Sequence, residues 1–128
     1  MLSVGSLGEI VHHETLGDGR YLIWVLGLGR VAVQEVASDR LYRKTDAQSI
    51  PDDEPDAEAA SALVPRLMDA IHSRAPRGQT LPSGLSLGLL ADMLLNSLPL
   101  DAERTAAVFV DPSPIRRARS ALAWHAET

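Results

Sequence analysis

The strongest constraint on the fold lies in residues 16–36, LGDGRYLIWVLGLGRVAVQEV, where runs of Leu, Ile and Val are separated by glycines. Glycines in such a stretch either hold a phosphate, as in a nucleotide enzyme, or bend a sheet. Residues 27–30, GLGR, lack the Gly-Lys-Ser/Thr ending of a phosphate-binding loop. A dinucleotide fingerprint needs a third glycine and a following helix, whereas a strand pattern follows here. We therefore interpret these glycines as a tight connection, a bulge or a barrel corner.

The first part of the chain, residues 1–50, predicts an antiparallel β-meander. Asp18-Gly19 indicates a two-residue hairpin, because a type I′ turn needs positive φ and this dipeptide supplies it. The run that follows the turn is apolar on both faces, which favours a position between two layers. The next run alternates with a period of two. The expected strands are residues 4–15, 21–26, 31–36 and 41–47.

The last part of the chain, residues 59–128, predicts four short helices that pack as an antiparallel bundle. Apolar residues recur at helical spacing, and Ser86, Asp101 and either Asp111 or Ser113 are expected to cap helices. The expected inward residues are Leu63, Val64, Leu67, Met68, Ile71, Leu87, Leu90, Ala91, Leu94, Leu95, Leu98, Ile115, Ala118, Leu122, and Trp124 or Ala126. The fold class is therefore α+β, an N-terminal antiparallel twisted sheet (a partial pseudo-barrel) followed by a C-terminal four-helix bundle.

Residues 51–58, PDDEPDAE, separate the two parts and combine acidic residues with two prolines. This composition is typical of a solvated linker, and its last acids favour the start of the next helix. No spacing typical of a calcium loop is present. The sequence therefore divides into a β-subdomain at residues 1–50, an acidic linker and a helical bundle at residues 59–128.

Composition narrows the classes of function. The 128 residues carry a formal net charge of −5, and aromatic residues make up 4%, which disfavours nucleic-acid binding. The chain has no cysteine, which excludes thiolate nucleophiles and zinc–thiolate sites. The first residues lack the pattern of a signal peptide, and no window is apolar enough to cross a membrane. We expect a cytoplasmic protein without membrane contact.

Candidates for chemistry are few. His12 and His13 are adjacent and point to opposite faces of a strand, so together they cannot hold one ion. A Ser–Lys dyad would need Lys44, the single lysine, beside Ser38 or Ser49, both in turn-like or linker sequence. The arginines of the last helix spread around its axis, which indicates a solvated surface; they are Arg116, Arg117 and Arg119. We expect no catalytic residue, no metal and no cofactor.

Several motifs together resemble the N-terminal substrate-binding domain family of Lon proteases. The resemblance covers nearly the whole chain except the loop at residues 72–86. In the first part it rests on Val4-Gly5, Ile10, Leu16-x-Asp18-Gly19-Arg20-Tyr21, Gly27-x-x-Arg30, Val33-x-x-Val36 and Tyr42. In the second part it rests on Leu87-x-x-Leu90-Ala91-Asp92-x-Leu94 to Leu98 and on PIRRARSAL, residues 114–122.

The chain also departs from the family pattern. Family members usually open with a strand, a proline-containing loop and a helix with Glu-Pro-Arg-Tyr, and this sequence begins after them; its true start could lie upstream. Leu41 stands where the family usually has proline, and Val31 where an aromatic is common. No Walker A loop occurs in these residues, so we expect neither the family's ATPase module nor its Ser–Lys peptidase activity here. The resemblance implies a stand-alone recognition module that binds unfolded or partner polypeptides, with a separate AAA+ protease as one partner.

The resemblance and the apolar strand together suggest a binding surface at Tyr21, Leu22, Trp24 and Leu26, although the same residues also suit a core. The alternative function is a small-molecule-binding or enzymatic domain with a pocket between sheet and helices. Without the family's early strands, a sheet edge and an apolar face would be exposed. We therefore expect a homodimer through the exposed edge, a re-paired first strand, or marginal stability.

Overall fold

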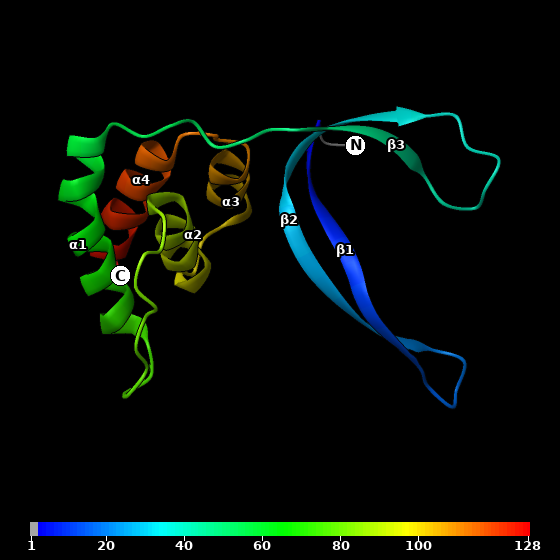
Figure 1. The fold of residues 1–128 in the computed structure, drawn as a ribbon, viewed down its shortest axis with the longest axis horizontal. Coiled ribbons are helices and arrows are strands. Elements are labelled where there is room, and N and C mark those ends of the chain that lie inside the picture. Colours follow the sequence, from blue (N-terminus) through cyan, green and yellow to red (C-terminus); the bar gives the residue numbers. More distant parts are fainter. Residues whose placement is uncertain (1–2) are drawn as a thin grey trace. The chain divides into compact units, whose positions relative to one another are not determined.

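The computed structural model describes residues 3–128, which belong to two compact units, Met1–Pro51 and Asp52–Thr128 (Figure 1). The first unit holds three strands and the second holds four helices, which confirms the α+β fold class. The elements are β1 (Val4–Thr15), β2 (Tyr21–Val36), β3 (Lys44–Ser49), α1 (Ala57–Arg74), α2 (Leu87–Ser97), α3 (Ala102–Phe109) and α4 (Pro114–Ala126). Within residues 3–128, no helix combines the length and apolar character that a membrane span requires.

The sheet is an antiparallel meander with the strand order β1-β2-β3. The predicted strands at residues 21–26 and 31–36 are one continuous strand, β2, because Gly27, Gly29 and Arg30 between them stay paired with β1. The last strand lies at residues 44–49 instead of the predicted 41–47. β3 pairs only with residues 31–36 of β2, so the earlier part of β2 pairs only with β1.

The hairpin between β1 and β2 forms as predicted, but its turn differs from the predicted type. The Leu16 amide donates to the Arg20 carbonyl at 2.7 Å, and the Gly19 amide donates to the Leu16 carbonyl at 3.2 Å. Gly19 has a φ of 83°, whereas no residue other than glycine has positive φ anywhere in residues 3–128. The connection is therefore a three-residue loop with a left-handed glycine at its end, a common hairpin geometry.

Two bulges bend the hairpin. Leu7 pairs with Gly29 and Gly8 with Gly27, so Leu28 is an extra residue on β2. A second shift between Ile10 and His12 makes Val11 an extra residue on β1. The expectation that Gly27 and Gly29 serve sheet geometry is confirmed, and the form they take is a bulge inside one strand.

The core of the helical unit is built from α1, α2 and α4. Their buried apolar residues recur at the predicted three-and-four spacing, and most of the predicted inward residues lie in this core or against it. Ala126 is exposed, in contrast to one of the alternatives for the last helix. Side chains that are fully enclosed or nearly so include Leu67, Leu90, Ala91, Leu94, Ala118 and Ala121.

Side-chain caps fix where the helices begin. The hydroxyl of Ser86 accepts from the Leu89 amide, and the carboxylate of Asp101 accepts from the Arg104 amide, as predicted. Ser113, the second of the two predicted alternatives, caps α4. α1 begins at Ala57, six residues before Leu63, the first predicted inward residue, because Asp56 caps it.

α3 contributes no fully buried residue. Its link to α4 is Arg104, which forms an ion pair with Glu127 at 2.7 Å and lies 5.0 Å from the centre of the Trp124 ring. The guanidinium above an aromatic face adds a cation–π attraction to the ion pair. α3 is therefore attached to the three-helix core by this polar and aromatic contact and by Val108, which packs against the core.

Candidate functional site

The first candidate surface is the two-stranded part of the sheet, residues 7–29, which we call the arm. Within residues 3–51 no second layer covers it, in contrast to the prediction from its apolar character on both faces. The large side chains of the arm stay exposed, with Trp24 at 59% and Tyr21 at 66% of their full accessible areas. The other exposed apolar residues of the arm are Leu7, Ile10, Val11, Leu16, Leu22, Ile23, Val25, Leu26 and Leu28.

The structure divides the four predicted contact residues between the two faces of the arm. Leu22, Trp24 and Leu26 alternate along β2 and share one face, whereas Tyr21 lies on the other. Trp24 pairs with His12 of β1, and the two ring centres are 5.0 Å apart with tilted planes. One face therefore presents a row of large apolar side chains centred on an indole.

A second cluster surrounds Arg117, whose side chain has no solvent exposure. Its Nε donates to Asp92 at 3.0 Å, while Nη1 and Nη2 donate to the two oxygens of Asp52 at 3.0 and 2.9 Å. Nη1 also donates to the Asp111 carbonyl at 3.0 Å. Burial alone lowers the pKa of Arg117, but the hydrogen bonds and charges of the two carboxylates, Asp52 and Asp92, outweigh it and leave the pKa raised.

Gly88 provides the space for this cluster. A β-carbon at Gly88 would stand 2.6 Å from Oδ2 of Asp52 and 3.0 Å from Nη2 of Arg117. α2 can therefore approach the ion pair closely only because this position lacks a side chain.

The buried role of Arg117 contradicts the prediction that all three arginines of the last helix are solvated. Pro114, Arg117, Ala118 and Ala121 are the buried residues of α4, so Arg117 stands within the inward stripe. The sequence signal that could have revealed this is the spacing of Arg117, which stands three residues after Pro114 and four before Ala121 on the buried face of α4. Helical spread around an axis excludes a shared patch but says nothing about which single arginine points inward.

The acidic segment before α1 is more than a solvated connector. Asp52 pairs with Arg117, the Asp53 amide donates to the Pro112 carbonyl at 2.8 Å, and Asp56 caps α1. These three contacts join the segment to α4 and to the start of α1. The cluster is a structural tie within the helical unit, because every donor on Arg117 already has a protein acceptor.

The sequence candidates for catalysis do not assemble into a reactive group. The Ser38 hydroxyl donates to the Tyr42 carbonyl at 3.0 Å, and Nζ of Lys44 lies 3.9 Å from Asp39. His12 contacts Glu14 at 3.2 Å on an exposed strand. Within residues 3–128, no three His, Cys, Asp or Glu side chains gather closely enough to hold a metal.

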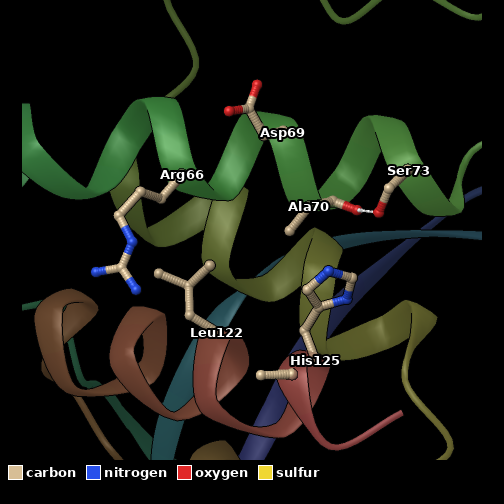
Figure 2. Close-up of a pocket in the computed structure, with 7 residues that line it drawn as sticks. Arg66, Asp69, Ala70, Ser73, Leu122 and His125 are labelled. Carbon is tan, nitrogen blue, oxygen red and sulfur yellow. Dashed lines mark hydrogen bonds between the residues drawn. The ribbon is translucent and has the colours of Figure 1, made fainter.

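An open depression of about 400 Å³ lies between α1 and α4 (Figure 2). Its lining residues are Arg66, Asp69, Ala70, Ser73, Leu122, His125 and Ala126. The Ser73 hydroxyl donates to the Ala70 carbonyl of its own helix at 2.7 Å, and Figure 2 shows the Asp69 carboxylate directed away from the His125 ring. These side chains do not form a nucleophile–base arrangement.

Two solved structures of Lon N-terminal domains are similar to this chain. The structure is similar to the N-terminal domain of a Mycobacterium avium complex Lon protease, with a TM-score of 0.72 and 17% sequence identity. The match covers 98% of this chain and 70% of the Mycobacterium chain. A Lon N-terminal domain protein from Xanthomonas campestris matches with a TM-score of 0.59 and 19% identity, over 96% of this chain and 68% of that one. No curated protein matches by sequence.

The two structural matches show the fold, and the family is shown by sequence. The sequence pattern of the ATP-dependent protease La (LON) substrate-binding domain matches residues 1–124, nearly the whole chain. This confirms the family indicated by the Asp-Gly-Arg-Tyr hairpin, the Gly-x-x-Arg step and the Leu-Ala-Asp helix. The chain belongs to the LON substrate-binding domain family.

Proposed function

We propose that this chain is a stand-alone recognition module that binds exposed apolar segments of unfolded polypeptides or of a protein partner. The single observation that carries the proposal is the arm, in which large apolar side chains stay exposed on both faces. Contiguous apolar surface of this kind marks interaction sites in soluble proteins. The family supports the same reading, because its description names a substrate-binding domain.

The contact surface that we propose is the face of Leu22, Trp24 and Leu26, with Tyr21 reaching a ligand from the other face at the tip. Trp is the residue type that most often dominates binding energy at protein interfaces. Its ring here is held against His12 and not enclosed. An extended apolar segment could lie along this row and contact each side chain in turn.

We further propose that these 128 residues carry neither ATPase nor peptidase activity, and that a separate AAA+ protease is one partner. The support is the residue content: the glycines at 27 and 29 form a bulge, and Ser38 and Lys44 are engaged with other groups. A cytoplasmic location stays part of the proposal.

The test is binding of a reduced, carboxymethylated polypeptide, which stays unfolded, followed by fluorescence anisotropy. Trp24→Ala should weaken binding about tenfold or more, since loss of a central indole commonly exceeds about 1.4 kcal/mol. Leu41→Ala is the matched control, because Leu41 is a fully exposed apolar residue outside the arm. Equal affinities of wild type and Trp24→Ala, with both folded, would refute the surface.

The alternative function, small-molecule binding, is tested by a different measurement, the thermal stability of the protein with and without ligand. A ligand at 100 times its dissociation constant would stabilise the fold by about 2.7 kcal/mol, which a thermal-shift screen of metabolites detects. The depression between α1 and α4 is open and lined by few convergent polar groups, so no observation favours this alternative over polypeptide binding.

A further inference from the structure

The arm has two lateral edges, and they differ in what they can accept. The outer edge of β1 carries charged or ionisable side chains and a bulge at Val11. Its ionisable residues are Glu9, His12, His13 and Glu14. Charges and bulges on an edge strand are the usual protection against pairing with another chain.

The outer edge of β2 has neither protection over residues 21–27, YLIWVLG. This stretch contains no charge, no proline and no bulge, and it is rich in residues that favour strands. β3 takes the same edge from Val31 onward, and the Ile50 amide after it donates to the Arg30 carbonyl at 2.9 Å. In the described sheet, residues 21–27 therefore have a strand partner on one side only. A two-stranded ribbon with two exposed apolar faces is at best marginally stable by itself in water.

We propose that a second copy of this chain pairs antiparallel with residues 21–27 of β2 around a two-fold axis at Trp24. The resulting sheet has the order β1-β2-β2-β1 across the two copies. The proposal concerns self-association and stands without the proposed binding of polypeptides.

The sequence of the edge is complementary to itself in this register. Trp24 lies opposite Trp24 of the partner, Leu22 opposite the partner's Leu26, and Ile23 opposite the partner's Val25. Directly opposed aromatic and branched apolar pairs are the cross-strand combinations that stabilise antiparallel sheets. One face of the four-stranded sheet then carries an unbroken row of Leu and Trp side chains.

β3 limits slippage in one direction. If the partner slid farther along β2, its hairpin tip would reach the positions beyond Val31 that β3 already occupies. Sliding in the opposite direction shortens the overlap and separates the two Trp24 side chains. The register centred on Trp24 therefore pairs the whole bulge-free apolar stretch, residues 21–27, with itself.

The absence of cysteine from the chain makes the register directly testable. In the proposed dimer the two Trp24 α-carbons face each other across an antiparallel pair, at about 4.5–5.5 Å, which a disulfide can span. Under mild oxidation, Trp24→Cys should form a covalent dimer much faster than Val11→Cys, which places an equally exposed thiol on β1. A mixture of Ile23→Cys and Val25→Cys should cross-link faster than either variant alone.

Sedimentation of the protein without introduced cysteines provides the second measurement. It is needed because Trp24→Cys itself removes the indole at the centre of the proposed interface. Wild type should sediment as a dimer at micromolar concentrations. Ile23→Lys should weaken association about tenfold or more by placing charge on the edge, whereas Val11→Lys should leave it unchanged. A wild-type monomer over the whole range, or equal cross-linking of Val11→Cys and Trp24→Cys, would overturn the proposal. Both experiments use the protein alone, without an unfolded polypeptide. A negative result would therefore refute the dimer and would leave the proposed polypeptide binding to its own test.

Discussion

The carboxylate of Asp52 accepts two hydrogen bonds from Arg117, at 3.0 and 2.9 Å, across 65 positions of sequence. The same guanidinium also reaches Asp92 on α2, so one buried cation joins the acidic segment, α2 and α4. The two carboxylates remain partly exposed, at 37% and 41% of their side-chain areas, and the cation is fully enclosed. The stability of the helical unit should therefore depend on this residue more than on any exposed arginine.

Replacing Arg117 by Met should lower the free energy of unfolding by about 1–3 kcal/mol, because it removes the buried donor of two carboxylates that water reaches only in part. Arg117→Lys should recover only part of this loss, since an ammonium cannot present the planar fork that two carboxylates share. Urea unfolding followed by circular dichroism measures both values. Arg119→Met is the control, because Arg119 is exposed on the same helix, and its unfolding curve should match wild type. Equal curves for Arg117→Met and Arg119→Met would contradict this account.

Gly88→Ala should destabilise the helical unit although alanine favours helices. The added β-carbon would stand 2.6 Å from Oδ2 of Asp52, so the carboxylate must move and lose its hydrogen bonds to Arg117. Overpacking of this kind costs about 1–3 kcal/mol, which exceeds the helix-propensity gain of about 1 kcal/mol.

The cause of the Gly88 effect can be isolated with a double-mutant cycle. In an Asp52→Ala background the obstructing oxygen is absent, so Gly88→Ala should cost clearly less than in wild type. An identical cost in both backgrounds would place the clash elsewhere.

The stability of the helical unit should fall in acid through Asp111. The hydrogen bond from Arg116 holds the pKa of Asp111 below its ordinary value, and the amide of Ser113 adds to this effect. A carboxyl group with a lowered folded-state pKa contributes stability above its unfolded pKa of about 3.9, and that contribution is lost as the pH falls through the folded value. Asp111→Asn should therefore flatten the pH dependence of unfolding below about pH 4. A wild-type slope in this variant would exclude Asp111 as its source.

Gly19→Ala should loosen the tip of the arm, because Gly19 has a φ of 83° that other residues adopt at a cost of about 1–2 kcal/mol. Amide exchange at Leu16, whose N–H bonds to Arg20 across the turn, should accelerate about fivefold or more. Gly17→Ala is the matched control, since Gly17 has neither positive φ nor a neighbour within reach of an added β-carbon. Equal exchange in the two variants would show that the left-handed glycine does not limit the turn.

The sequence predicted correctly those features that depend only on residues close to one another in the chain. Caps at Ser86 and Asp101 were predictable, because a side-chain oxygen three residues before an amide depends only on nearby residues. The core stripes of α1 and α2 followed from periodicity. The meander followed from the turn signal at Asp18-Gly19, although the type of turn did not.

Other features depended on which segments meet. The bulge at Leu28 kept residues 21–36 in one strand, because β1 supplies pairing partners on both sides of the extra residue. The sequence left open whether Trp24 belongs to a core or to an exposed surface, because an apolar pattern on both faces is typical of a buried strand and also of an uncovered one.

By itself the sequence determined the family, the order of strands and helices, and where most helices begin, since these follow from local chemistry and periodicity. Only the tertiary structure decided that Arg117 lies inside and is held by Asp52 and Asp92. A buried charge is tolerated only where distant partners converge on it, and that convergence is a property of the folded chain.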